Sequence, residues 1–430
     1  MRKVVSLVLA LVMVLGICAM ASAEGTKLTL WTFIDQHATF YKTMADEWNK
    51  DNPDRQIELD ATVLGYDDMH NKLKIALQSG VGAPDLCDVE LGQFPNVLLG
   101  EPQLVKLNDY LAPFIDTIVP SRLSIYSKGD DHYGVPTHVG ACVAFYNVEL
   151  LEAAGIDYKT IVTWDDWMAA GKKLKEANPD VYMGCVETTT NWQTSLMLTQ
   201  QGAGFQDNEN PDDPKPTVDT PELLKAITMQ QKWLEDGIAM VCPGGQPDTE
   251  EGKAWINGGN CATVIMAEWY MSRFVDEIKD MAGKYAIAPA PVFEVGQPRS
   301  IGLGGTGTVV SLTCPDKDLA ANFIAWAKLS EKGEEFIWNV MGFDPVNTAV
   351  WDNKELTHNP ENKFNKYFLT NVFDTLNEIK DEIMYLPSTS ISPSINSYTG
   401  STLWNNVYID KLDAAEELKI AQEAIEADIF

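Results

Sequence analysis

Side chains that could carry out catalysis are few in this sequence, apart from its carboxylates. The chain has five histidines, and none falls in an HxH, HExxH or GxSxG context that would indicate a metal site or a nucleophile. Its 62 acidic residues could supply the carboxylate pair of a glycosidase, but in so acidic a chain such a pair is available by chance. We therefore predict no catalytic residue, no metal site and no cofactor. A secreted glycoside hydrolase stays open as an alternative.

Aromatic side chains with hydrogen-bonding neighbours form a more informative pattern. Trp31, Trp192 and Trp269 each lie at or just beyond the end of a strand-like run, and amide or carboxylate side chains stand beside each of them. Open α/β sheets bind ligands at the carboxyl ends of their strands. A sugar presents apolar C–H faces and a rim of hydroxyls, which suits flat aromatic surfaces bordered by amides and carboxylates. The pattern therefore predicts a sugar-binding cleft.

Alternating strand-like and helix-like runs must position these side chains. The expected strands are residues 28–31, 56–63, 84–90, 181–187, 261–267 and 285–290. The expected helices are residues 38–50, 67–78, 165–176, 191–201, 221–236 and 316–329. Such alternation is typical of α/β sheets with crossover helices. The extended stretches 133–146 and 302–311 contain several glycines, and we interpret them as crossings between two α/β regions.

Other aromatic and imidazole side chains are assigned to structural roles. We expect His138, within the first crossing, to be held by structural hydrogen bonds. The tryptophans assigned to packing or capping are Trp48, Trp164, Trp167, Trp233 and Trp326. The six cysteines beyond residue 23 include no CxxC pair, and several lie in strand-like apolar runs. We expect mostly free, buried thiols, although export would permit disulfides.

The first 23 residues are predicted to be a signal peptide. Arg2 and Lys3 give a basic start, an apolar stretch follows, and residues 21–23 read Ala-Ser-Ala. A lipid anchor on Cys18 stays open as an alternative, although Ile17 is larger than the residue that a lipidation motif prefers at that position. No later apolar run is long enough to span a membrane. We expect an exported protein, periplasmic or extracellular.

The net charge of the chain limits its partners. Removal of Arg2 and Lys3 leaves 62 acidic against 30 basic residues, a formal charge of −32. A chain this acidic repels nucleic acid and anionic lipid, so neither is an expected partner. A neutral or cationic ligand is favoured. A polyamine bound in the same kind of cleft therefore remains an alternative to a sugar, because tryptophan also binds cations.

The chain resembles the family-1 extracellular solute-binding proteins of carbohydrate ABC transporters, the group that includes maltose-binding protein. The motifs that carry the resemblance are LTLWTF from residue 28, GVGAPDLCDVELGQF from 80, YGVPTHVGACVAFYNVELLEAAGID from 133 with TWDDW after it, CATVIMAEWY from 261, GLGGTGTVVS from 302 and MGFDPVN from 341. The resemblance implies an α/β fold of two lobes, the type II periplasmic-binding-protein fold, with hinge crossings near 137–142, 303–309 and 343–347. The lobes implied are residues 24–138 with 308–345, and residues 139–307 with 346–430.

Carried over by position, the resemblance also implies a ligand-binding site between the lobes. Its candidate residues are Trp31, Asp35, Gln36, Tyr66, Glu90, Gln93, Asn191, Trp192, Trp269, Asp344 and Trp404. The implied function is that of a monomeric receptor, not an enzyme. It would capture a neutral mono- or oligosaccharide by closing its lobes and deliver it to the membrane permease of an ABC importer.

Overall fold

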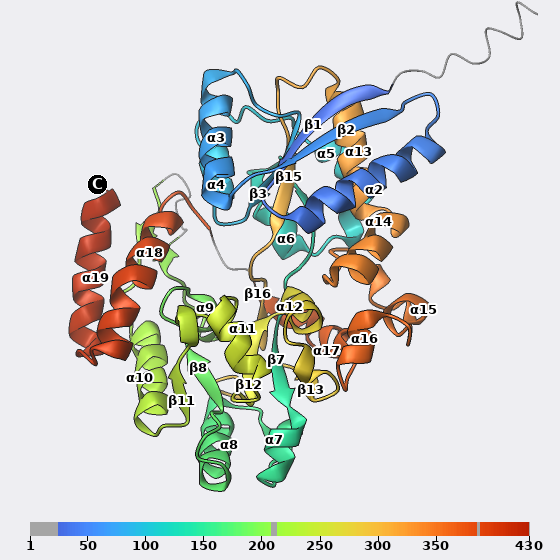
Figure 1. Ribbon diagram of the computed structural model, residues 1–430. Coiled ribbons are helices and arrows are strands. Elements are labelled where there is room, and N and C mark those ends of the chain that lie inside the picture. The colour runs from blue at the N-terminus through green and yellow to red at the C-terminus, as the bar shows by residue number, and fades with distance from the viewer. Residues whose placement is uncertain (1–24, 208–212, 385–387, 430) are drawn as a thin grey trace, which may run out of the picture.

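The computed structural model describes residues 25–207, 213–384 and 388–429. The predicted signal peptide, residues 1–23, and the candidate lipidation residue Cys18 lie outside them. Figure 1 shows two bodies of strands and helices, one above the other, joined by a few stretches of chain. We call the upper body, which contains the N-terminal strands, the first lobe, and the lower body the second lobe.

A five-stranded sheet forms the centre of the first lobe, in the order β2-β1-β3-β15-β6. The strands β1 (Thr26–Thr32), β2 (Ile57–Val63) and β3 (Leu86–Glu90) are parallel, whereas β15 (Thr306–Val310) runs antiparallel to β3 and to β6 (Val135–Pro136). Thr306 and Gly307 precede the lobe boundary expected at residue 308, yet they pair with β3 in this sheet. All five residues of β15 are buried, which fits a strand in the middle of a sheet covered on both faces.

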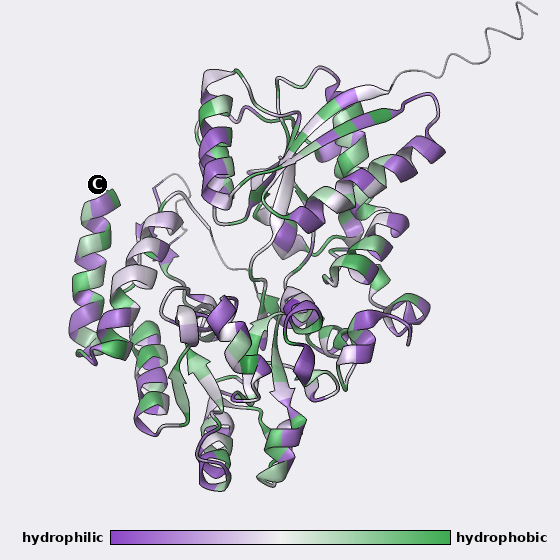
Figure 2. Ribbon diagram, viewed as in Figure 1, coloured by the Kyte–Doolittle hydropathy of each residue, from purple (hydrophilic) through white to green (hydrophobic). Residues whose placement is uncertain are grey.

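Helices from distant parts of the sequence cover this sheet. The helix α2 (Asp35–Asp51) buries residues at a spacing of three to four positions, as an amphipathic helix on a core does. Its neighbour α13 (Lys317–Leu329) is almost three hundred residues away in sequence, and Figure 1 shows it beside α2. The helix α3 (Tyr66–Ser79) stands at the other side of the sheet. Figure 2 shows hydrophilic and hydrophobic residues alternating along α2 and along the outer helices of the second lobe.

A shorter sheet of three antiparallel strands lies in the second lobe. Its central strand β7 (Cys142–Asn147) is buried throughout, between β12 (Thr263–Ala267) and β13 (Tyr285–Ala288). Beside it, β8 (Gly184–Val186) and β11 (Ala239–Val241) form a parallel pair. The surrounding helices are α8 (Trp164–Ala177), α9 (Trp192–Gln200), α10 (Pro221–Glu235), α18 (Ser392–Tyr398) and α19 (Ala414–Ile429).

Most of the tryptophans assigned to packing are buried in these cores. Trp164, Trp167 and Trp233 pack ring against ring in the second lobe, and the predicted packing role is confirmed for them. Trp48 and the half-buried Trp326 meet between α2 and α13, with ring centroids 5.5 Å apart. The six cysteines of the described chain are free thiols, and all except Cys185 are buried.

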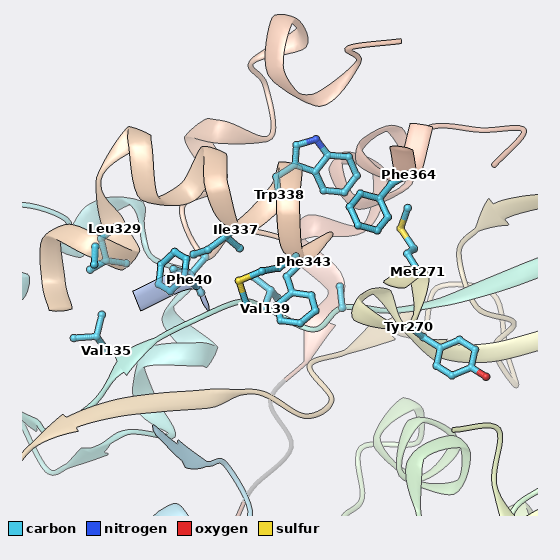
Figure 3. Close-up of a cluster of buried hydrophobic side chains, with 14 of the residues drawn as sticks. Phe40, Val135, Val139, Tyr270, Met271, Leu329, Ile337, Trp338, Phe343 and Phe364 are labelled. Carbon is cyan, nitrogen blue, oxygen red and sulfur yellow. The ribbon is translucent and has the colours of Figure 1, made fainter. Parts of the chain in front are cut away.

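The hydrophobic core continues from one lobe into the other through the crossings. A single cluster of buried side chains contains both Leu30 of β1 and Phe145 of β7. Figure 3 shows Val139 and Phe343, which belong to two different crossings, with Phe40 of the first lobe on one side and Met271 of the second lobe on the other. Because these side chains exclude water from the junction, the two lobes form one packed body at the hinge.

Arg122 ties the first crossing to the second. It lies in α6 (Pro120–Ser124) and is only 1% exposed. Its Nε donates a hydrogen bond to the His138 carbonyl oxygen (3.1 Å), and its Nη2 donates to the carbonyl oxygen of Gly304. A guanidinium presents several donors in a fixed plane, so it can hold two backbone segments in one arrangement.

Asp344 ties the third crossing to the first, and it corrects one of the predicted ligand contacts. The carboxylate is fully buried and accepts hydrogen bonds from the backbone N–H groups of Gly140 and Ala141, both at 2.8 Å. Its own backbone N–H donates to Glu268 Oε2 (2.9 Å) at the end of β12. Burial raises the pKa of Asp344 to about 6, although these amides lower it. Asp344 therefore holds the hinge together and does not face a ligand.

Candidate ligand-binding site

A cavity of about 760 Å³ lies between the two lobes. Its lining comes from the strand-end loops of the first lobe, the hinge crossings, the start of α9, the turn after β12 and residues 388–396 before and within α18. A volume of this size is typical of small-molecule sites, and the position between two lobes is a common one for them. The cavity is therefore the candidate site.

The first-lobe wall of the cavity is built around Glu90 at the end of β3. Tyr66 donates its hydroxyl hydrogen to Glu90 Oε2 (3.0 Å), and the Gly92 amide donates to the same oxygen (2.7 Å). Phe33 packs edge-on against Tyr66, with ring centroids 5.2 Å apart. Partial burial raises the pKa of Glu90, although its two donors lower it. Gln93, three residues after Glu90, also lines this wall.

The second-lobe wall carries two indole rings set almost at right angles. The rings of Trp192 and Trp269 meet edge to face, with centroids 5.9 Å apart and an interplanar angle of 82°. Trp269 donates its indole N–H to the carbonyl oxygen of Leu303 in the second crossing (3.0 Å). Together the two rings form an apolar corner of the cavity, and one of them is fixed directly to the hinge.

Arg273 and Asp248 form an ion pair on the same wall. Arg273 Nε lies 2.9 Å from Asp248 Oδ1, and Nη2 lies 3.1 Å from Oδ2, so the pair is bidentate. The guanidinium also lies over the ring of Trp269, 5.3 Å from its centroid. Because the two charges neutralise each other, this pair adds hydrogen-bonding groups to the wall without adding net charge.

Behind Trp192 lies the buried carboxyl group of Glu187. Glu187 Oε2 accepts a hydrogen bond from the backbone N–H of Gln193 in the first turn of α9 (3.1 Å). Burial raises the pKa of Glu187 to about 7, although the amides of Gln193 and Trp192 lower it. Glu187 therefore fixes the start of α9, which positions the Trp192 ring.

Seven of the eleven predicted site residues line the cavity together. They are Gln36, Tyr66, Glu90, Gln93, Asn191, Trp192 and Trp269. The strand-end pattern and the family resemblance thus led to lining residues in both lobes.

Asn191 connects the second-lobe wall to α18 and to Trp404. Its Nδ2 donates a hydrogen bond to Asn396 Oδ1 (2.8 Å), and its Oδ1 accepts one from the Trp404 indole N–H (2.7 Å).

The other four predicted residues are not on the cavity wall. Trp31 still belongs to β1, where it pairs with Thr62 and Cys87, so the loop begins later than expected and Phe33 lines the cavity instead. Asp35 is exposed in the first turn of α2. Trp404 is fully buried behind Asn191, and Asp344 is in the hinge.

Sequence reasoning also missed several lining residues. Arg273 lies one helical turn after Trp269, a spacing that could have placed it on the same surface. No sequence signal pointed to Gln206 or to residues 388–396, which reach the cavity only because α18 packs near α9. His138 was expected to have structural hydrogen bonds, and that expectation is wrong: both of its ring nitrogens are buried and have no partner among the described residues.

Two α/β lobes joined by several crossings, with a cavity between them, define the class of two-lobe periplasmic-binding-protein folds. A family model described as "Bacterial extracellular solute-binding protein" matches residues 33–334. The chain belongs to this family of extracellular receptors, and the predicted family and two-lobe fold are confirmed.

Two relatives with the name "Arabinooligosaccharide-binding protein" are similar to most of the chain. The one from Halalkalibacterium halodurans is 41% identical over 409 residues, which cover 94% of this chain and 90% of the relative. The one from Bacillus subtilis is 39% identical over 384 residues, which cover 88% and 87%.

Solved structures share the fold at low sequence identity. The sugar-binding protein MalE from Xanthomonas citri has a TM-score of 0.78 at 17% identity, with 94% of this chain and 97% of that chain covered. A binding protein from B. animalis subsp. lactis, solved in complex with beta-1,6-galactobiose, has a TM-score of 0.73 at 18% identity, with 94% and 97% covered.

Among the helices of residues 25–207, 213–384 and 388–429, none is long and apolar enough to cross a membrane. The same part of the chain contains no cluster of three or more histidine, cysteine or acidic side chains that could hold a metal ion.

Proposed function

We propose that this protein is the receptor of an ABC importer for arabino-oligosaccharides. The observation that carries the proposal is the 41% identity, over nearly the whole chain, to a protein named for binding arabino-oligosaccharides. The cavity supports it, because the corner formed by Trp192 and Trp269 offers apolar surface for the C–H faces of a sugar. Around it stand amide, hydroxyl and carboxylate groups for the sugar's hydroxyls.

The charges that line the cavity favour a neutral ligand over a polyamine. Its carboxylate residues are Glu90 and Asp248, and Asp248 is already paired with Arg273. A ligand with several ammonium groups would therefore find one free carboxylate among these side chains and an arginine nearby. A neutral sugar needs only hydrogen bonds and apolar contact, which both walls offer.

The same pairing argues against a glycoside hydrolase. A hydrolase needs two carboxyl groups free to exchange protons or attack the sugar. Asp248 holds Arg273 through both of its oxygens, so that ionic contact would have to break before Asp248 could act as an acid or base. We propose that the protein binds and releases its sugar unchanged.

Closure of the lobes is part of the proposal. A ligand shifts a conformational equilibrium only by its different affinities for the two states. A sugar in this cavity would contact Glu90 and Tyr66 on one side and Trp192 and Trp269 on the other, so it would favour the arrangement in which both walls are close. The receptor would be exported and would work outside the cytoplasmic membrane, either after removal of residues 1–23 or attached to the membrane through Cys18. The closed, monomeric receptor would then deliver the sugar to a permease in that membrane.

Isothermal titration calorimetry on residues 24–430 tests the proposal. The panel contains arabinobiose, arabinotriose, galactobiose, maltotriose and spermidine, and each incubation is checked afterwards for free monosaccharide. We expect saturable binding that is strongest for an arabino-oligosaccharide, without release of arabinose. Binding of spermidine but of no sugar would contradict the proposal, and so would breakdown of the bound sugar.

A further inference from the structure

We infer that His37 and His138 form a hydroxyl-binding floor of the cavity, at the junction of the lobes. His37 lies in the first turns of α2, His138 lies in the first crossing, and both line the cavity. The inference rests on the proposed function, because it names the residues that would recognise the sugar's hydroxyl groups in that cavity.

The tautomer of His37 is fixed from behind by Asp88. The two side chains are buried, and His37 Nδ1 lies 3.0 Å from Asp88 Oδ2. Asp88 also accepts hydrogen bonds from Tyr41 (2.6 Å) and Thr308 (2.7 Å), and its Oδ1 is 4.0 Å from the ammonium group of Lys328. An ionised carboxylate can only accept hydrogen bonds, so His37 Nδ1 must carry a proton toward it.

The other ring nitrogen of His37 is left for the cavity. Nε2 is buried and has no hydrogen-bond partner among the described residues. His37 lines the cavity, and Nε2 is the ring nitrogen that Asp88 leaves unbonded. A sugar hydroxyl suits this nitrogen, because a hydroxyl can accept a hydrogen bond from an N–H or donate one to a lone pair.

His138 presents two further unpaired nitrogens. Its ring packs on Phe343 with centroids 4.6 Å apart, and neither Nδ1 nor Nε2 has a partner within the described chain. Burial, together with the nearby charge of Arg122, lowers the pKa of His138, so the ring is neutral. A neutral imidazole offers one donor and one acceptor. A hydroxyl group can accept a hydrogen bond from the donor or donate one to the acceptor.

The two imidazoles flank one aromatic ring. Phe343 of the third crossing contacts His138 on one side and His37, at 6.1 Å between centroids, on the other. Gln36, the neighbour of His37, also lines the cavity, and its Oε1 is buried with no partner in the described part of the chain. Unpaired polar atoms from the first lobe and from the hinge thus gather at one place in the cavity.

His70, at the edge of the same wall, has a protein partner for each of its ring nitrogens. Its Nδ1 lies 2.8 Å from the Tyr66 carbonyl oxygen, and its Nε2 accepts a hydrogen bond from the Glu90 amide (3.1 Å). His70 does not line the cavity, and its nitrogens are satisfied by the protein. Buried polar atoms without a partner lower the stability of a fold, so a ligand that completes the bonds of His37 and His138 would remove this cost.

The chemistry of the floor suits hydroxyl groups. A hydroxyl can both donate to and accept from an imidazole, so it matches His37 and His138 whichever of their ring nitrogens carries a hydrogen. The floor therefore fits the hydroxyls of a neutral sugar.

Titration calorimetry with arabinotriose tests the floor in the full mature chain. We expect His37→Phe and His138→Phe each to weaken binding about tenfold, as expected for loss of one or two hydrogen bonds. The matched control is His358→Phe, since His358 lies on the surface in an ion pair with Asp374, away from the cavity. It should bind as the wild type does. A urea titration of each variant identifies any that fail to fold.

A second measurement needs no substitution. In nitrogen-15 spectra of the wild-type imidazoles, saturating arabinotriose should shift the resonances of His37 Nε2 and of the His138 ring nitrogens, while His358 stays unchanged. Failure of the wild type to bind any arabino-oligosaccharide would overturn the proposed function and the floor with it. Normal binding with unchanged imidazole resonances and unchanged variant affinities would overturn the floor alone.

Discussion

The two walls of the cavity each rest on a buried carboxyl group, and the pKa values of these two groups are shifted in opposite directions. Asp88 lies behind the first-lobe wall, in contact with His37 and Tyr41 and 4.0 Å from Lys328. Burial by itself raises its pKa, but these partners outweigh burial and hold the pKa well below its usual value. Glu187 lies behind the second-lobe wall with backbone amides for partners and no cation, and burial raises its pKa to about 7.

The difference shows that burial alone does not decide the charge of a carboxyl group. The pKa of a buried carboxyl group falls where a cation and several donors face it, and it rises where hydrogen-bond donors without a cation do. The first-lobe wall is therefore fixed by a network of charged and polar groups. The second-lobe wall is fixed by the start of a helix and by packing of aromatic rings.

Replacement of Asp88 by Asn should produce the largest effect. The substitution leaves the buried ammonium group of Lys328 without its counter-charge, and breaking a buried pair costs about 3–5 kcal/mol of unfolding free energy. Urea unfolding measures this loss. The matched control is Asp318→Asn, which breaks the exposed ion pair with Arg55 and should cost less than about 1 kcal/mol. Equal losses for the two variants would mean that the network does not hold the first-lobe wall.

Glu187→Gln should change the pH dependence of stability. The pKa of Glu187 is raised on folding from 4.5 to about 7, so the folded state binds the proton more tightly than the unfolded state. The stability that this gives is fully present below pH 4.5 and is lost as the pH rises to about 7, a change of up to about 3 kcal/mol. The unfolding free energy of the variant minus that of wild type should therefore be larger at pH 8 than at pH 5.

Thermal and urea unfolding at the two pH values check this expectation. Glu355→Gln serves as the control, because Glu355 is exposed on α15 (Lys354–Thr357). If wild type and Glu187→Gln lose stability in parallel between pH 5 and pH 8, the pKa of Glu187 is not raised on folding.

Trp269→Ala tests the aromatic wall itself. Removal of the indole should cost about 2–3 kcal/mol of binding free energy, because large aromatic side chains at the centre of a site carry much of its affinity. Calorimetry should show a loss of roughly 30-fold to 150-fold in affinity for the arabino-oligosaccharide. Trp326→Ala, in a half-buried position between α2 and α13, should lower stability and leave affinity unchanged. Unchanged affinity for folded Trp269→Ala would remove this residue from the site.

Tyr66→Phe should have the smallest effect and tests the first-lobe wall. The substitution removes one of the donors to Glu90 Oε2, worth about 1 kcal/mol or roughly a fivefold change in affinity. Tyr110→Phe removes a comparable hydroxyl–carboxylate hydrogen bond, to Asp318 at 3.3 Å, away from the cavity. Its affinity should stay at the wild-type value. If Tyr66→Phe lowers the affinity as much as Trp269→Ala does, the two walls contribute equally to the binding free energy.

Sequence reasoning predicted the fold, and about two thirds of its predicted site residues line the cavity, because both rest on local patterns and on the family resemblance. Alternating strands and helices predict the sheets, and the ends of strands predict where Glu90, Trp192 and Trp269 must meet. Trp31 was expected at the end of a strand and in the cavity wall, but β1 continues through Trp31 to Thr32. Strand ends are set by pairing with neighbouring strands, here up to Thr32 opposite Val63, and the pairing is not visible in the strand's own residues.

The remaining errors concern contacts between distant segments. Asp344 binds the amides of Gly140 and Ala141, about two hundred residues away, so its sequence neighbours could not distinguish a hinge carboxylate from a ligand contact. Trp404 packs behind Asn191 in the same way. His138 was expected to be satisfied because most buried polar groups are, and only the three-dimensional surroundings show that it is an exception.

The hinge that Arg122 and Asp344 hold together has a consequence for how this receptor can evolve. When only a fraction of molecules is in the binding-competent arrangement, the measured affinity is the intrinsic affinity multiplied by that fraction. Substitutions at Gly140 or Asp344, which do not line the cavity, can change that fraction while every lining residue stays the same. Lineages that meet scarce or abundant sugar can thus adjust their affinity at these positions and keep their selectivity, since selectivity resides in the residues that line the cavity.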